Sequence, residues 1–288
     1  MQEAPTTPPP VSLRPQALRA LCMAEPDAKV VATQALFEAM QKGVTSLDPS
    51  ERIEAEPGLA LPGRPVRPEL IAPTAVPHRS PFTADGLAAL LHAVTHIEFN
   101  AINLALDAVW RFADMPVAYY ADWMRVAHEE AIHFGLLRDH LQSLDHDYGD
   151  FPAHDGLWEM CVKTQHDVTA RMALVPRTLE ARGLDATPPM QARLRKVGTP
   201  AALRAVDILD VILRDEIGHV AIGNRWYAWL CEREGLDPVA HYRTLARRHA
   251  APRLRPPFNE VARLAAGFHM QEIQALGAHQ PVHPPTGG

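Results

Sequence analysis

From about residue 82 onward, apolar residues recur at steps of three and four, the spacing of helices that bury one face. A kink is expected at Pro176, followed by a short, separate helical piece over 189–196. Two further amphipathic segments follow at 237–250 and 258–268. No run alternates with the period of two that marks a strand, so the pattern predicts an all-α protein. The long helices that it predicts cover about 83–112, 116–144, 157–182 and 200–233.

The beginning of the chain follows a different pattern, because prolines interrupt it. Two short helices are predicted over 13–24 and 27–40, the second of them capped by Asp27. The stretch 57–81 cannot be helical, since each of its many prolines removes a backbone donor and restricts the preceding residue. Apolar residues lie between these prolines, so we expect an extended arm that packs on the main domain rather than a free linker.

These patterns predict three parts. Residues 1–81 form N-terminal helices and a proline-rich arm packed on the main domain. Residues 82–235 form that domain, which is a bundle of long helices. Residues 236–288 form a C-terminal helical segment and a flexible tail.

The composition is that of a soluble globular protein, with 47% hydrophobic and 22% charged residues among 288 and a net charge of −6. No apolar run is long enough to span a membrane, and the N-terminus lacks the basic start and apolar stretch of a signal peptide. The three cysteines lie far apart, which suits a reducing compartment. We therefore expect a cytoplasmic protein without membrane contact and without a broad electrostatic attraction to nucleic acid.

Acidic residues interrupt the apolar faces of the long helices. In the helix over 200–233, Glu216 and His219 lie in the middle of the apolar stripe, where a helical bundle normally places leucine. The helix over 116–144 repeats this arrangement with Glu130 and His133. A buried carboxylate is costly unless it is paired or coordinates a metal ion. The stripes therefore indicate cations between the helices.

The spacing of these residues supports a shared metal site. Glu-x-x-His places a carboxylate and an imidazole on one helix face, one turn apart, and the motif occurs in two of the stripes. A single glutamate precedes each motif, by 32 residues in the first hairpin and by 36 in the second. The midpoints, Asp114 and Gly198, both fall in predicted turns, so each pair of glutamates would lie level across an antiparallel hairpin. The predicted ligands are Glu98, Glu130, His133, Glu180, Glu216 and His219.

Four glutamates and two histidines in this arrangement form the ligand set of ferritin-like di-iron and di-manganese proteins. The chain resembles the ferritin-like superfamily of di-metal carboxylate proteins over roughly residues 10–270. In particular, it resembles an uncharacterised bacterial ferritin-like family. The motifs that carry the resemblance are HIEFNAINLALDA, HEEAIHF, DFPAHDGLWEM, ARMALVPRTLEARGLD and RDEIGHVAIGNRW. The resemblance implies a ferritin-like four-helix bundle with a di-metal site. The string LEARG around Glu180 is also similar to a ligand segment of bacterial tRNA hydroxylases in the same superfamily.

Some residue roles stay open at this point. Glu159, Asp167 and His166 are rivals of Glu180 as the ligand from the third long helix. Asp107, Asp167 and Asp210 are candidates for the hydrogen-bond partners of the ligand histidines. His92 and His96 either line an access channel or are ordinary surface or core residues.

The ligand types favour two Fe ions, with Mn/Fe or Mn₂ as alternatives, because carboxylate and imidazole suit these metals and no thiolates are present. We therefore expect a non-haem di-iron oxidase or monooxygenase that uses O₂, an organic small-molecule substrate and an electron donor, with a homodimer as one allowed assembly. A ferroxidase that handles iron is one alternative. A tRNA-modifying hydroxylase is another, prompted by LEARG and by the basic segment 243–255.

Overall fold

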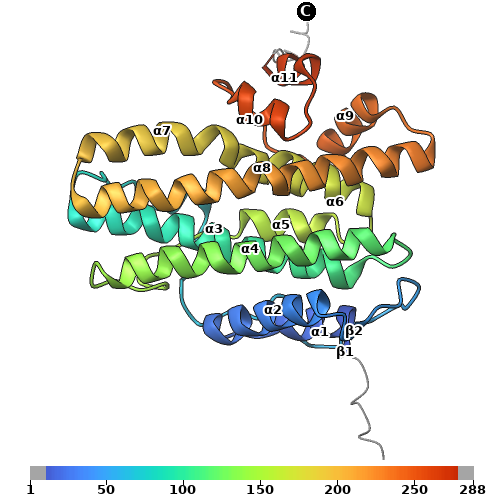
Figure 1. Cartoon of the computed structure of the whole chain (residues 1–288). Coiled ribbons are helices and arrows are strands. Elements are labelled where there is room, and N and C mark those ends of the chain that lie inside the picture. The colour runs from blue at the N-terminus through green and yellow to red at the C-terminus, as the bar shows by residue number, and fades with distance from the viewer. Residues whose placement is uncertain (1–10, 278–288) are drawn as a thin grey trace, which may run out of the picture. The chain divides into compact units, whose positions relative to one another are not determined.

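The computed structural model describes residues 11–277, and it is mostly helical, as predicted (Figure 1). The tail predicted at the C-terminal end and the first ten residues lie outside this range. The chain divides into two compact units, one up to Trp158 and the other from Glu159. None of the helices within 11–277 is long and apolar enough to cross a membrane.

The first unit is built on a hairpin of two long helices, α3 (Ala84–Arg111) and α4 (Val117–Gln142), which lie side by side (Figure 1). The hydroxyl of Thr83 caps α3 by accepting a bond from the Gly86 amide. Asp114 has a positive φ of 61° in the turn, and Tyr120 closes this turn by donating its hydroxyl proton to the Phe112 carbonyl. Both predicted helices are confirmed within two residues at each end.

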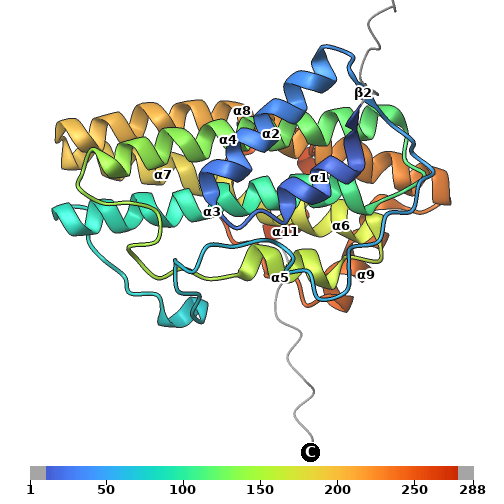
Figure 2. The same cartoon turned by 90° about the horizontal axis from the view of Figure 1, so that it is seen from below.

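Two shorter helices, α1 (Leu13–Leu21) and α2 (Pro26–Gln41), pack on α3 and α4 respectively (Figure 2). The second helix begins at Pro26 and not at a cap by Asp27, so that prediction was wrong. Proline fits the first helical turn because its missing N–H would have no partner there. Two strands of two residues each, β1 (Val11–Ser12) and β2 (Thr45–Ser46), pair in parallel. They are too short to leave an alternating pattern.

Arg14 of α1 is fully buried and connects this layer to the end of α3. Its guanidinium donates to the carbonyls of Val109 and Trp110, which have no partner within α3 because the helix ends there. It also donates to the carbonyls of Asp48 and Glu51 in the segment after β2. One side chain therefore satisfies the end of a long helix and holds the segment that leads into the arm.

The proline-rich arm packs against the first unit, as expected from its apolar residues. The indole of Trp110 donates to the Ile53 carbonyl, and the Gly63 amide donates to the Leu21 carbonyl. Glu69 and Ile71 exchange backbone bonds with Ala153. The prediction that no part of the arm is helical was wrong for one turn of 3₁₀ helix, η1 (Pro73–Ala75).

The second unit contains a hairpin of α7 (Ala181–Val197) and α8 (Pro200–Glu234). The turn lies where the sequence predicts it: Gly198 ends α7 with a φ of 70°, and the Thr199 hydroxyl caps α8. Contrary to prediction, α7 is not interrupted before residue 189, although Pro188 and Pro189 lie inside it.

Asn259 explains why α7 tolerates the first of these prolines. The missing N–H of Pro188 would have bonded to the Leu184 carbonyl, and the side-chain amide of Asn259 donates to that carbonyl instead, at 3.1 Å. Asn259 also caps α10 (Glu260–Ala265) through the Ala262 amide. A contact from 75 residues away thus preserves the helix.

The helix predicted over 157–182 is divided. It forms α5 (Gly156–Lys163), α6 (Val168–Leu174) and a π-helix, η2 (Val175–Glu180), which leads directly into α7. The break between α5 and α6 is stabilised by buried Arg171, which donates to the Thr164 hydroxyl at 2.8 Å and to the Cys161 carbonyl at 2.6 Å. The expected kink at Pro176 is a change of helix type.

The remaining helices, α9 (Pro238–Arg248), α10 and α11 (Met270–Gly277), complete the second unit. A buried cluster joins α10 and α11 to α7 and α8, and it includes Ala262 and Ile273 of the former pair and Leu184 and Val220 of the latter. This cluster holds α10 and α11 against the start of α7, which directly follows the π-helix.

Candidate metal centre

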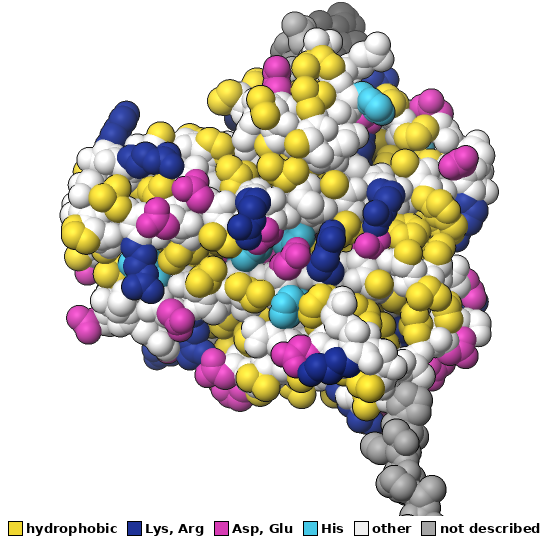
Figure 3. All heavy atoms as spheres, viewed as in Figure 1, with side chains coloured by type: hydrophobic (Ala, Val, Ile, Leu, Met, Phe, Trp, Pro, Cys, Tyr) yellow, Lys and Arg dark blue, Asp and Glu magenta, His cyan; other side chains and the backbone are white. Residues whose placement is uncertain are grey.

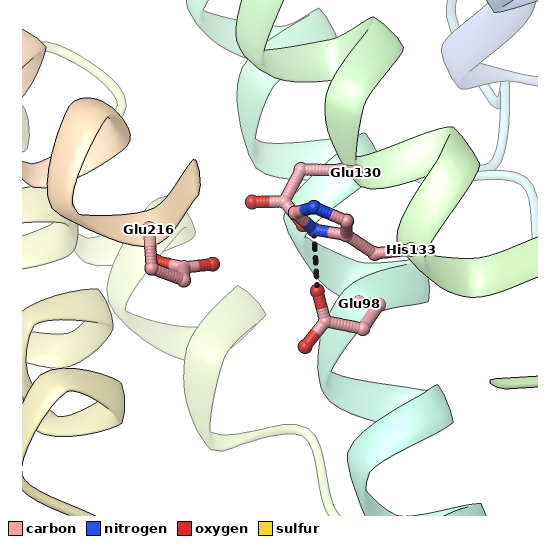
Figure 4. A group of neighbouring side chains, drawn as sticks. All are labelled: Glu98, Glu130, His133 and Glu216. Carbon is pink, nitrogen blue, oxygen red and sulfur yellow. Dashed lines mark hydrogen bonds and ion pairs between the residues drawn. The ribbon is translucent and has the colours of Figure 1, made fainter. Parts of the chain in front are cut away.

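Three predicted ligands meet in the first unit. Glu98 projects from α3, and Glu130 and His133 project from α4, all of them buried (Figure 4). The Nδ1 atom of His133 lies 3.2 Å from a Glu130 carboxylate oxygen and 3.3 Å from a Glu98 oxygen. One ligand atom from each of the three residues lies within 4.8 Å of the others. This group can hold a metal ion.

Packing beside the group keeps the two helices level. Phe99, which follows Glu98, packs against Phe134, which follows His133, with ring centroids 5.4 Å apart. Because the helices are antiparallel and the turn is at Asp114, these neighbours fix the height at which the ligands face each other. The level arrangement inferred from spacing is therefore found in this hairpin.

The buried carboxylates of this group are stabilised by positive charge. Burial and the neighbouring charge of Glu130 raise the pKa of Glu98 well above its usual range. Burial alone would lower the pKa of His133, but its hydrogen bonds to Glu130 and Glu98 raise this pKa to about 11. The imidazolium of His133 therefore balances part of the negative charge in a space where a metal cation would balance it more completely.

The second unit repeats the motif on α8. Glu216 and His219 are both nearly or fully buried, and the His219 Nδ1 atom lies 3.6 Å from a Glu216 oxygen. Glu216 is labelled in Figure 4 as well. Glu180 is the last residue of the π-helix and is 9% exposed. The three residues are thus buried glutamates and a histidine at the positions that the sequence predicts for the second hairpin.

A close contact with α8 fixes the π-helix that carries Glu180. Gly223 lies one turn beyond His219, and a β-carbon at Gly223 would be only 2.4 Å from the β-carbon of Pro176. The Thr178 hydroxyl donates to the Ala173 carbonyl at 2.7 Å, a bond that spans five residues, as expected in a π-helix. Such single π-turns occur frequently at functional sites. Sequence reasoning predicted a kink here but missed the role of Gly223.

Burial favours Glu180 over its rivals. Glu159 and His166 are exposed, and Asp167 caps α6 by accepting a bond from the Ala170 amide at 2.8 Å. Two other candidates for supporting roles are also engaged elsewhere. Asp107 accepts bonds from Arg111, and Asp210 accepts one from Gln191.

His92 and His96 are core residues with hydrogen-bond partners. His92 Nε2 accepts a bond from the Gly149 amide, and His96 pairs with the Tyr148 hydroxyl at 2.9 Å and with Asn100. Burial lowers the pKa of each to about 4, so both imidazoles are neutral at physiological pH. They hold the loop around Tyr148 on α3. They are therefore core residues, the alternative to lining an access channel.

The comparisons with known proteins identify the family to which the chain belongs. The sequence model of a family described as "Protein of unknown function (DUF455)" matches residues 22–274, a range that includes all six predicted ligands. The chain belongs to the DUF455 family. It is 45% identical over 261 residues to a protein of Haemophilus influenzae described as an uncharacterized protein, covering 88% of this chain and 90% of that relative. No solved structure matches.

Proposed function

We propose that the chain is a ferritin-like di-metal carboxylate protein in which the α3–α4 and α7–α8 hairpins form a four-helix bundle around two metal ions. The buried group of Glu98, Glu130 and His133 carries this proposal. Two carboxylates and an imidazole in one buried space are costly without a cation, and their atoms are close enough to share one.

The second hairpin supports a site with two ions. It offers the same residue types in the same order, with a single glutamate before the turn and Glu-x-x-His after it. Both turns lie at the midpoints between the paired glutamates, at Asp114 and Gly198. Glu98, Glu130 and Glu216 lie near the middles of α3, α4 and α8, and Glu180 directly precedes α7 at the end of the π-helix. Two hairpins of this kind provide four carboxylates and two imidazoles, which is the set that two ions require in ferritin-like proteins.

The donor atoms favour iron, with Mn/Fe and Mn₂ as alternatives. Bound iron would supply the electrons with which O₂ is reduced, in an oxidase or monooxygenase reaction on an organic substrate. The chain's own residues hold the negative charge that retains the metal and keep water out. Ala101 and Ala127, each one turn from a proposed ligand glutamate on the same helix, are buried and apolar.

Metal analysis of protein produced with added iron tests the proposal. We expect about two irons per chain, and loss of at least one of them in Glu130→Gln and in Glu216→Gln. Glu129→Gln and Asp215→Asn are matched controls, because each changes the acidic residue next to a proposed ligand and each of these residues pairs with a surface arginine instead. Both controls should keep their iron.

Three results would contradict the proposal: stoichiometric zinc, no bound metal, or iron that all four variants retain. Oxygen consumption by the iron-loaded protein then separates the reaction classes. Continued consumption with added Fe(II) and growth of a ferric core would indicate a ferroxidase, whereas an oxidase consumes little O₂ until its organic substrate is added.

A further inference from the structure

The second unit contains a cavity of about 610 Å³ that the metal proposal does not use. It is formed by α9, the segment 249–257 and α11, and its floor is the π-helix, through Arg177. The Tyr242 hydroxyl, also at the cavity, bonds to the Thr178 hydroxyl of the π-helix at 3.0 Å. A volume of this size is within the range of sites for small molecules.

The walls of the cavity are strongly basic. Glu272 is the one acidic residue among the lining residues, and Arg177 neutralises it by donating to its carboxylate. The other terminal nitrogen of the Arg177 guanidinium, Nη1, is also occupied, since it donates to the Asn224 side-chain oxygen at 2.6 Å. The remaining lining arginines are Arg243, Arg247, Arg253 and Arg255.

Within residues 11–277, none of these four arginines forms a salt bridge with a carboxylate. This differs from the face of the molecule in Figure 3, where basic and acidic side chains are interspersed. Four like charges around one hollow repel one another unless an anion lies among them, and a concave site concentrates their field. The cavity therefore has the charge of an anion-binding site.

Part of the wall is apolar, which restricts the ligand further. Leu254, Phe268 and Leu276 line the cavity together with Val239. A ligand that fills the volume would place an apolar or aromatic part against these residues and its anionic part among the arginines. A single carboxylate would balance only one of four guanidinium groups, whereas phosphate groups accept the paired bonds that guanidinium donates and carry more charge.

We propose that this cavity binds a small organic phosphate, such as a phosphomonoester or diphosphate with an apolar or aromatic part. The proposal depends on the cavity alone and not on the metal centre. Binding would bring the ligand against the π-helix through Arg177 and Tyr242.

Calorimetric titration of the full chain tests this, with inorganic pyrophosphate and adenosine diphosphate as probes. We expect both to bind, and Arg247→Gln and Arg253→Gln each to weaken binding about tenfold, the effect of losing one charge-assisted contact. Arg248→Gln is the matched control, because Arg248 is the next residue of α9 and does not line the cavity. It should bind as the unchanged protein does, and circular dichroism checks that all variants fold.

The apolar wall has its own test. Leu254→Ala should weaken the binding of adenosine diphosphate while leaving pyrophosphate unaffected, because only the former has a part that reaches the wall. Absence of binding by the unchanged protein would overturn the proposal, as would equal weakening in Arg248→Gln. It would also be overturned if tRNA bound much more tightly than either probe and lost that binding in Arg247→Gln, since the arginines would then serve a nucleic acid.

Discussion

Gly223→Ala tests whether the π-helix and α8 must approach closely to position Glu180. The new β-carbon would lie 2.4 Å from the Pro176 β-carbon and 2.6 Å from its γ-carbon. Carbon atoms in ordinary contact are about 3.5–4.0 Å apart, so one of the two elements must move by about 1 Å. Both contacts are to a rigid ring, which cannot rotate away.

The magnitude follows from two opposing terms. Overpacking of this kind costs about 1–3 kcal/mol, while alanine in place of a helical glycine gains about 1 kcal/mol. Gly218→Ala on the same helix gains the second term alone, because a β-carbon there meets nothing within 4 Å. We therefore expect the free energy of unfolding to differ between the two variants by about 1–3 kcal/mol, with Gly223→Ala the less stable.

Denaturant unfolding of both variants measures this difference, and iron content gives the functional readout. A shift of the π-helix should weaken metal retention about tenfold, the effect that misplaced supporting residues have on metal sites. Equal stability of the two variants would refute the close approach. A loss of stability with unchanged iron content would refute the assignment of Glu180 as a ligand.

Two further predictions concern the first unit. Arg14→Met should lower the free energy of unfolding by about 3 kcal/mol, because it leaves buried carbonyls at the end of α3 without donors. Arg19→Met, at an exposed position of the same helix, should have little effect in the same denaturant titration. Burial lowers the pKa of His92 to about 4 from 6.5, so between these values the unfolded chain binds a proton that the folded chain does not, and stability falls as the pH drops. The fall should reach about 3 kcal/mol for this residue in metal-free protein. His92→Gln should reduce it, and an unchanged pH dependence in that variant would contradict the assignment.

The parts of the fold that the sequence predicts well are those whose causes are local. The spacing of apolar residues defines α3, α4 and α8 because each buries one continuous face. The turns at Asp114 and Gly198 follow from short polar or glycine-containing segments between such faces. The Glu-x-x-His motifs are also local, since one helical turn determines which residues share a face.

The wrong prediction for α7 depends on a partner far away in sequence. Nothing near Pro188 indicates that Asn259 will satisfy the carbonyl that the proline leaves open. The break after α5 depends on a nearer contact, in which Arg171 of the next helix donates to the freed Cys161 carbonyl. Prolines and the spacing of apolar residues indicate only a local preference for structure. Contacts with other parts of the chain overcame that preference in α7, and they produced a break after α5 where the pattern was continuous.

The π-helix shows why a sequence predicts the height of a side chain along a helix better than the direction in which that side chain points. Height along a hairpin depends on counting residues from the turn, and one residue more or less changes it by only about 1.5 Å. Direction is more sensitive, because each residue turns a helix by about 100°, so the wider turn that begins at Val175 changes the face on which a side chain emerges. Glu180 lies at the end of that turn. Its proposed role as a ligand therefore depends on the non-local contact of Pro176 with Gly223, which leaves no mark in the sequence except the absence of a side chain.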